Sequence, residues 1–243
     1  MNLEKIYLKT NSEHNKYKKK IFDSLRLNNK KILDIGYSDY IQPNLKNEFT
    51  ILDNNKKLLQ LAKKNKLKII KKNLDDDKPL NIKNNSYDVI LFLDSLEHLA
   101  KAEERFEEII KKLKNNGLII LSVPNTYNII NRIFFLLNIN IDITDNNHLI
   151  KKKVFSDHLH QISFKKIKKL IKKNNLKITK KYFYFIKKIK RHKNLKFLNS
   201  LNNLISFCKL QCLFPNLFSH GIVLLIKKNE YPRTEVRVFR QRK

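Results

Sequence analysis

Short apolar runs alternate with amphipathic stretches along most of this chain. The run YDVILFL (87–93) is continuously apolar, as expected for a strand that is covered on both faces. Apolar residues at helical spacing predict helices between such runs. We predict strands over residues 31–35, 49–52, 67–70, 87–93, 118–123, 176–186 and 221–227, and helical stretches over 17–27, 54–65, 102–113, 127–137, 164–173 and 195–218.

Proline and glycine mark the breaks in this pattern. Residues 41–47 have room for only a stunted helix between two predicted strands, with Pro43 in its first turn. Asn116 and Gly117 are predicted to stop the helix that begins at Ala102, and Pro124 closes the next strand. Strand–helix alternation of this kind predicts an α/β fold, with a parallel sheet and helices on both of its faces.

Candidate binding residues follow the first two predicted strands, because ligands of an open parallel sheet bind at the carboxyl ends of its strands. The first strand leads into Gly36, where a missing side chain lets a ligand approach the backbone closely. The second strand ends in Asp53, nineteen positions beyond Asp34, where a carboxylate suits the two hydroxyls of a ribose. A structural alternative stays open: Gly36 only turns the chain, and Asp53 only caps the helix starting at Asn54.

The stretch NSYDVILFLDSLEHLAKAEERFEEIIKKLKNNGLIILSVPN (85–125) narrows the class of protein. It combines acidic residues with Glu-His, Asn-Gly and Pro-Asn pairs at spacings that a dinucleotide dehydrogenase does not need: Asp88, Asp94, Glu97, His98, Asn116, Gly117, Pro124 and Asn125. The stretch resembles the fourth strand, next helix and fifth strand of class I S-adenosylmethionine-dependent methyltransferases, in the broad small-molecule group with the pattern EHL…GxLxxSVPN. The resemblance extends weakly over residues 157–178.

The resemblance implies a Rossmann-like fold with a seven-stranded, mainly parallel sheet and an antiparallel last strand. Residues 31–35 would be central, with residues 221–227 antiparallel beside them. The implied domain covers residues 31–228, with substrate-cap insertions at about 126–160 and 190–218. An N-terminal helical segment (1–30) would precede it and a basic tail (229–243) would follow.

The resemblance also implies S-adenosyl-L-methionine as the cofactor and assigns residues to it by position. Asp34 and Gly36 would lie in the loop on the methionine side, and Asp53 would bind the ribose hydroxyls. The pair Asn73-Leu74 would lie beside the adenine, with Asp75 as the alternative. The full set of implied cofactor-binding residues is Asp34, Gly36, Ser38, Asp53, Asn54, Asn73, Leu74 and Asp94.

The first loop departs from the family pattern D-x-G-x-G-x-G. Here the stretch from Asp34 to Tyr40 reads DIGYSDY, so two of the three glycines are missing. Ser38 is small, whereas Asp39 and Tyr40 crowd a loop that has to surround the cofactor. This departure bears on cofactor affinity rather than on the fold.

Three histidines are the candidate catalytic residues, ranked His98, His158 and His160. Methyl transfer to oxygen often needs a base near neutral pH, and histidine supplies one. By resemblance, His98 follows the fourth strand close to the transferred methyl, and Glu97-His98 open the next helix. The alternatives are ordinary loop or cap histidines, and helix-start acids at Asp94 and Glu97 that the helix dipole stabilises.

Amino-acid composition indicates less about function than the high net charge suggests. The formal net charge is +30, but it comes from lysines spread over nearly every polar face together with abundant asparagine and isoleucine. An A/T-rich coding sequence gives the same bias, so a nucleic-acid partner is left open but not favoured. Cys208 and Cys212 have no further ligands nearby, so no metal site is expected. A reducing cytoplasm is the expected setting, with peripheral membrane contact left open.

These observations predict an S-adenosylmethionine-dependent methyltransferase that acts on a small or lipid- or glycan-linked acceptor, at oxygen. Two alternatives from other classes remain. One is a degenerate methyltransferase fold without catalysis, motivated by the glycine-poor loop. The other is a basic protein that binds nucleic acid or an anionic membrane surface, motivated by the charge and the apolar stretch 129–137.

Overall fold

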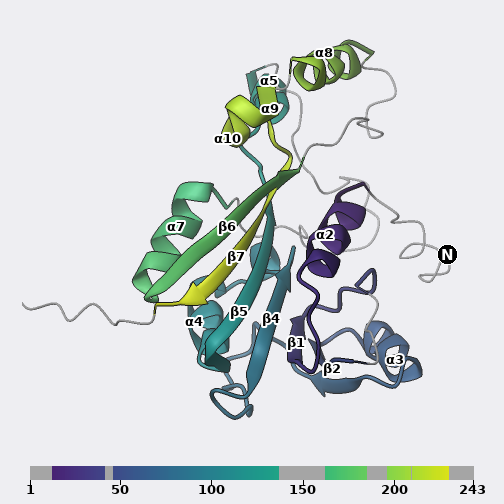
Figure 1. Ribbon diagram of the computed structural model, residues 1–243, viewed down its shortest axis with the longest axis vertical. Helices are drawn as coiled ribbons and strands as arrows, with labels where there is room; N and C mark the ends of the chain where they lie inside the picture. The colour runs from purple at the N-terminus through teal and green to yellow at the C-terminus, as the bar shows by residue number, and fades with distance from the viewer. Residues whose placement is uncertain (1–12, 42–45, 137–161, 185–195, 209, 230–243) are drawn as a thin grey trace, which may run out of the picture.

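The computed structural model describes residues 13–41, 46–136, 162–184, 196–208 and 210–229. A seven-stranded sheet with the order β3-β2-β1-β4-β5-β7-β6 forms its centre (Figure 1). Only β7 runs antiparallel to its neighbours β5 and β6. The strands are β1 (Lys31–Ile35), β2 (Glu48–Asp53), β3 (Lys68–Lys71), β4 (Tyr87–Leu93), β5 (Leu113–Pro124), β6 (Leu176–Tyr184) and β7 (Gly221–Lys228).

This sheet confirms the predicted Rossmann-like fold with an antiparallel last strand, but one detail of its order was wrong. Strand β1 lies inside the sheet and pairs with β2 and β4. Strand β7 is not beside β1, because β4 and β5 lie between them. Its partner is β5, with register pairs from Leu118↔Lys227 to Pro124↔Gly221.

Helices cover both faces of the sheet, as the strand–helix alternation predicts. They are α2 (Glu13–Ser24), α3 (Lys56–Lys64), α4 (Ala102–Ile110), α5 (Ile129–Leu136), α7 (Phe164–Lys173), α8 (Lys196–Phe207), α9 (Leu210–Leu213) and α10 (Pro215–Phe218). A short 3-10 turn, η1 (Leu96–His98), follows β4. None of the helices in the described ranges is long and apolar enough to cross a membrane.

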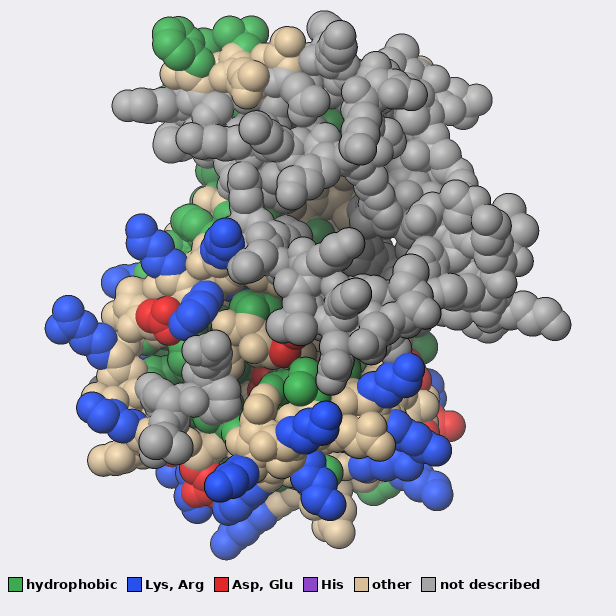
Figure 2. Space-filling view, turned by 90° about the vertical axis from the view of Figure 1, so that its right-hand side faces the viewer, with side chains coloured by type: hydrophobic (Ala, Val, Ile, Leu, Met, Phe, Trp, Pro, Cys, Tyr) green, Lys and Arg blue, Asp and Glu red, His purple; other side chains and the backbone are tan. Residues whose placement is uncertain are grey.

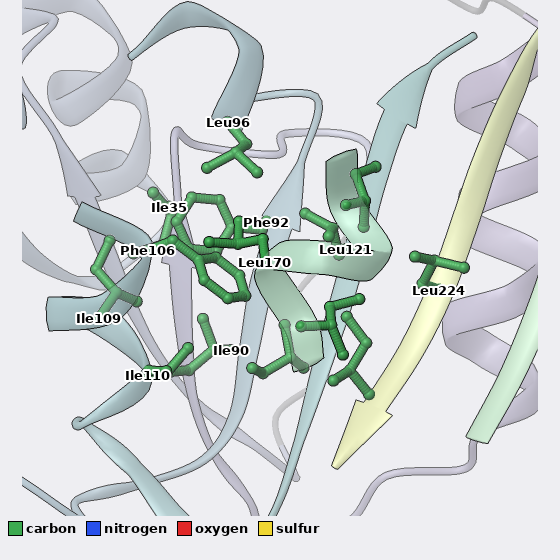
Figure 3. Packing of buried hydrophobic residues seen from close by; sticks show 14 of the residues in the cluster. Ile35, Ile90, Phe92, Leu96, Phe106, Ile109, Ile110, Leu121, Leu170 and Leu224 are labelled. Carbon is green, nitrogen blue, oxygen red and sulfur yellow. The ribbon is translucent and has the colours of Figure 1, made fainter. Parts of the chain in front are cut away.

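Two core layers form because successive strand residues point to opposite faces. On one face, Ile35 and Phe92 pack with Phe106 of α4 and Leu170 of α7 (Figure 3). On the other face, residues such as Ile32 pack with the apolar sides of α2 and α3. The sheet is therefore buried on both faces, which explains the continuously apolar sequence of β4.

The boundary between α4 and β5 differs from the prediction. The helix ends at Ile110 and β5 already begins at Leu113, so Asn116 and Gly117 are strand residues and not a helix stop. They lie where the pairing of β4 with β5 shifts register between Tyr87 and Val89. A Cβ atom on Gly117 would lie 2.5 Å from the Leu113 side chain, so the glycine serves this close approach.

Helices α5, α8, α9 and α10 stand beyond the carboxyl end of β5 (Figure 1). The Asn125 side-chain amide, just after β5, donates hydrogen bonds to the backbone oxygens of Asn216 and Ser219, each at 2.9 Å. These bonds join the end of β5 to α10 and to the start of β7. The stunted helix predicted at 41–47, the cap insertion predicted at about 126–160, and the basic tail fall largely outside the described residues.

Candidate active site

The loop after β1 turns at Gly36, which has a φ of +72°. A Cβ atom there would lie 3.2 Å from the Cβ of Ser95, so both the backbone conformation and the close approach favour glycine. Neither Ser38 nor Tyr40 has a positive φ. The two glycines that the family pattern places at these positions are therefore not required by the backbone of this loop.

Asp34 organises the same loop from inside the sheet. Its buried carboxylate accepts hydrogen bonds from the Ser38 backbone N–H at 2.8 Å and from the Ser38 hydroxyl at 3.1 Å. Burial raises the pKa of Asp34 to about 7, and the two Ser38 hydrogen bonds act in the opposite direction. Asp34 thus fixes the loop in place at the carboxyl end of β1.

Asp53 connects the first loop to the start of α3. Its carboxylate accepts the backbone N–H of Tyr37 at 3.1 Å and that of Asn55 at 2.8 Å. The residue that caps α3 is Asn55, whose side chain accepts the N–H groups of Lys57 and Leu58. Asp53 is only partly buried, and each of its oxygens can accept a further hydrogen bond.

The structure gives the other residues implied around the adenine different surroundings. Asn54 is exposed, whereas Leu74 is buried in the core layer that includes α4. The Asn73 side chain accepts the N–H of Asp75 at 3.1 Å, and the Asp75 carboxylate accepts the N–H of Ala100 at 2.8 Å. Leu74 therefore anchors the loop after β3 in the core.

Asp94 lies directly after β4, in a left-handed backbone conformation with a φ of +51°. Its N–H donates to the Ser122 backbone oxygen at 3.0 Å, and the Ser122 hydroxyl donates to its carboxylate at 2.5 Å. The other carboxylate oxygen forms an ion pair with the ammonium group of Lys18. Asp94 thus connects β4, β5 and α2.

Lys18 is a site residue that the sequence analysis missed. It projects from α2 and is 2% exposed, with its ammonium nitrogen 5.9 Å from the ring centroid of Tyr40 and 5.8 Å from that of Tyr184. Burial lowers the pKa of Lys18 to about 7, against the opposing effect of the Glu97 charge. One signal was present: Lys18 shares the apolar face of its helix with Ile21 and Phe22, at spacings of three and four.

Glu97 is the most deeply buried acid of this region, with 1% of its surface exposed. Neither of its carboxylate oxygens has a hydrogen-bond partner on another of the described residues. Burial raises the pKa of Glu97 to about 7, although a hydrogen bond from its own backbone N–H and the charge of Lys18 oppose the rise. Burial also raises the pKa of the Tyr184 hydroxyl, and the charge of Glu97 adds to that effect.

The predicted histidines are only partly within the described residues. His98 is half-buried in η1, next to Glu97, and its N–H donates to the Ser95 oxygen at 3.3 Å. The prediction that Glu97 and His98 open the next helix was wrong. They belong to η1, which ends at His98, and α4 begins only at Ala102. His158 and His160 lie outside the described residues.

The chemistry of these side chains fits S-adenosylmethionine. Asp53 has free acceptor capacity for a ribose, and the carboxylates of Asp94 and Glu97 suit a positively charged sulfonium. Among the described residues, no group of three or more His, Cys, Asp or Glu side chains could hold a metal ion. The sheet order, the turn after β1 and the acids after β2 and β4 define a class I S-adenosylmethionine-dependent methyltransferase.

Comparison with known proteins agrees with this class. A family model described as a methyltransferase domain matches residues 14–181. The chain belongs to this methyltransferase family, and its cofactor is S-adenosylmethionine. No curated protein matches the chain significantly.

Solved structures share the fold at low sequence identity. An S-adenosylmethionine-dependent methyltransferase from Archaeoglobus fulgidus has a TM-score of 0.56 and 15% identity, over 88% of this chain and 93% of that one. A Thermotoga maritima enzyme named as a possible histamine N-methyltransferase also gives 0.56 and 15%, over 89% of each chain. A Mesorhizobium loti S-adenosylmethionine-dependent methyltransferase gives 0.53 and 11%, over 85% of this chain and 96% of that one.

Proposed function

We propose that this enzyme methylates a hydroxyl oxygen of a small or lipid- or glycan-linked acceptor, and that Glu97 takes the proton of that hydroxyl. The observation that carries the proposal is the Glu97 carboxylate, buried beyond the carboxyl end of β4 with no hydrogen-bond partner on another of the described residues. An unpaired buried carboxylate costs free energy, so its retention points to a partner that arrives with a ligand.

Glu97 has the properties of a general base for a hydroxyl. Its pKa of about 7 lies near the pH at which a base transfers protons most effectively. Bound S-adenosylmethionine supplies an electrophilic methyl group on its sulfonium. As the acceptor hydroxyl took that methyl group, Glu97 would take up the proton that the hydroxyl loses. His98 is the second candidate for this role, and His158 and His160 remain candidates behind it.

The cofactor-binding residues belong to the same proposal. Asp53 and the adjacent Asn54 would bind the ribose, with Asn73 and Leu74 beside the adenine. Asp34 would act through Ser38 by holding the loop around Gly36, and Asp94 would face the cofactor after β4. The geometry supports this for Asp34, Asp53 and Asp94, which lie at the carboxyl ends of three adjacent strands.

The acceptor side would be formed by the cap insertions, of which the structure describes α5 and α8 to α10. Their apolar side chains suit an acceptor with an apolar part. The Thermotoga maritima neighbour is named for an amine acceptor, so nitrogen is the alternative to oxygen. We also propose that the enzyme acts in the cytoplasm, as its cysteine content predicts.

The proposal is tested by transfer of a radiolabelled methyl group from S-adenosylmethionine to a panel of phenols, sugars and polyprenyl alcohols, with histamine and other amines beside them. We expect a hydroxyl acceptor to be methylated, and Glu97→Gln to lower turnover by about 10²–10⁴-fold at saturating cofactor. Glu104→Gln, at an exposed glutamate of α4, is the control and should keep full turnover.

Two outcomes would contradict the proposal. If only amines are methylated, the oxygen assignment is wrong. If Glu97→Gln keeps full turnover whereas His98→Gln loses it, the base is His98 instead. Affinity for S-adenosylhomocysteine, measured for each variant, separates a lost base from a lost cofactor site.

A further inference from the structure

Large apolar side chains are exposed at one end of the molecule. Six of them lie on α5, α8 and α9 or directly after α9, and Phe207 and Leu136 are 86% and 81% exposed. We call these six residues the apolar tip: Phe135, Leu136, Leu204, Phe207, Leu213 and Phe214. Among the described residues, the other exposed large apolar side chains are Tyr127, just before α5, and Ile69 in β3. Exposed apolar surface is therefore concentrated beyond the carboxyl end of the sheet.

The apolar tip belongs to one packed unit. Helix α9 contacts α8 and α10, and α10 contacts α5. The Phe214 and Phe218 rings lie 6.5 Å apart, and the Asn125 amide ties α10 to the end of β5. Figure 1 places all four helices at the top of the molecule, where Figure 2 shows a group of hydrophobic side chains. Concentrated exposed apolar surface on a folded unit marks an interaction site.

The charge pattern indicates the kind of partner. None of the four helices contains an Asp or Glu residue, whereas the whole chain has a formal net charge of +30. In the sequence, the basic stretch KKIKRHK (187–193) ends two residues before α8. A second copy of so basic a chain would be repelled, and a nucleic acid offers little apolar surface to Phe and Leu side chains. An anionic bilayer matches both features.

We propose that the apolar tip docks on the surface of an anionic lipid membrane, with its Phe and Leu side chains inserted at the boundary between headgroups and acyl chains. Apolar insertion and attraction to anionic lipid add together in such interfacial binding. The docking concerns the membrane and not the methyl acceptor, so it needs neither cofactor nor acceptor. A failure of membrane docking would therefore not contradict the proposed methyl transfer.

The chain contains no tryptophan, which makes single-tryptophan reporters unambiguous. Phe207→Trp places a reporter in the apolar tip, and Ile69→Trp places the matched control on edge strand β3, where Ile69 is 40% exposed. Each protein is mixed with vesicles of phosphatidylcholine alone, or of phosphatidylcholine with phosphatidylglycerol. We expect the Phe207→Trp emission to shift to the blue and to be quenched by brominated acyl chains only with anionic vesicles. The Ile69→Trp emission should not change.

Two double variants distinguish docking of the apolar tip from the general attraction of a basic protein to anionic lipid. The first removes apolar side chains without changing the net charge, and the second lowers the net charge elsewhere. Phe207→Ser combined with Leu213→Ser should lower partitioning onto anionic vesicles at 0.15 M salt by about tenfold or more, since burial of two large apolar side chains is lost. Lys63→Gln combined with Lys64→Gln, on α3, lowers the charge but leaves the apolar tip intact, and should change partitioning by less than about threefold.

Three results would overturn the proposal. One is equal partitioning of the tip variant and the wild type. Another is a Phe207→Trp emission that does not respond to anionic vesicles. The last is a dimer in solution, in the absence of lipid, in which the Phe207→Trp emission is already shifted to the blue.

Discussion

Glu97 and Asp34 are single side chains whose burial makes stability depend on pH. Burial raises the pKa of each carboxyl to about 7, from ordinary values of 4.5 and 3.8. In the unfolded chain both groups lose their protons near the ordinary values. Between about pH 4 and pH 7 the folded state therefore binds more protons than the unfolded state, and the free energy of unfolding falls as pH rises.

Glu97→Gln removes one of these two titrations. We expect its free energy of unfolding to depend less steeply on pH than that of the wild type between pH 5 and pH 7. The difference in slope should be up to about 1.4 kcal/mol per pH unit, the value for one proton. Urea denaturation at pH 5, 6 and 7 measures it, with Glu104→Gln as the control. Parallel curves for Glu97→Gln and the wild type would show that Glu97 is ionised throughout this range.

Individual site residues could be predicted from sequence where they follow a strand. Asp34, Gly36, Asp53 and Asp94 were singled out in this way, and the structure places them at the predicted edge of the sheet. Lys18 could not be singled out, because one lysine among 52 basic residues carries no visible signal until its neighbours on the helix are compared. Its pairing with Asp94, across 76 positions of sequence, depends on the fold.

At the scale of elements, apolar patterning predicted β4 and α7 with their observed bounds. It failed at the junction of α4 and β5, where Asn116 and Gly117 read as a helix stop. Their role comes from the register shift against β4 and from the Leu113 side chain, which are tertiary features. The separate turn η1 was missed because a 3-10 turn of three residues has no periodicity to detect.

Helix α2 should be held to the sheet in part by the Lys18–Asp94 ion pair. Lys18→Met keeps most of the apolar volume but removes the charged donor of Asp94. At pH 6, below the pKa of Lys18 of about 7, we expect it to lower the free energy of unfolding by about 1–3 kcal/mol. Lys19→Met on the same helix removes only a surface pair with Asp23 and should cost about 0–1 kcal/mol.

A double-mutant cycle checks that the effect belongs to the pair. Lys18→Met combined with Asp94→Asn should be less destabilising than the sum of the two single variants, because each already removes the same interaction. Urea denaturation at pH 6 gives the four free energies. Equal losses for Lys18→Met and Lys19→Met would mean that the buried pair does not hold α2.

For the whole molecule, the net charge of +30 says little about the class of protein, whereas one stretch of sequence, 85–125, identified it. Charge is a property of the surface, and many functions tolerate it. The fold positions the site because helices cover both faces of the sheet, while Asp34, Asp53 and Asp94 lie together at the carboxyl ends of its adjacent strands. The apolar content of α5 and α8 could be read from sequence, but its exposure could not, since exposure depends on how these helices pack.

Calorimetric titration with S-adenosylhomocysteine tests the central claim, that the carboxyl edge of β1, β2 and β4 binds the cofactor despite the glycine-poor loop. We expect the wild type to bind, and Asp53→Ala to bind more weakly by about 1–3 kcal/mol, the loss for a charged acceptor. Asp88→Ala is the matched control, because Asp88 also accepts a backbone N–H, from Lys31 at 2.9 Å, but at the amino end of β4. It should keep wild-type affinity. No binding by the wild type at millimolar ligand, or equal affinities for Asp53→Ala and the wild type, would contradict the account.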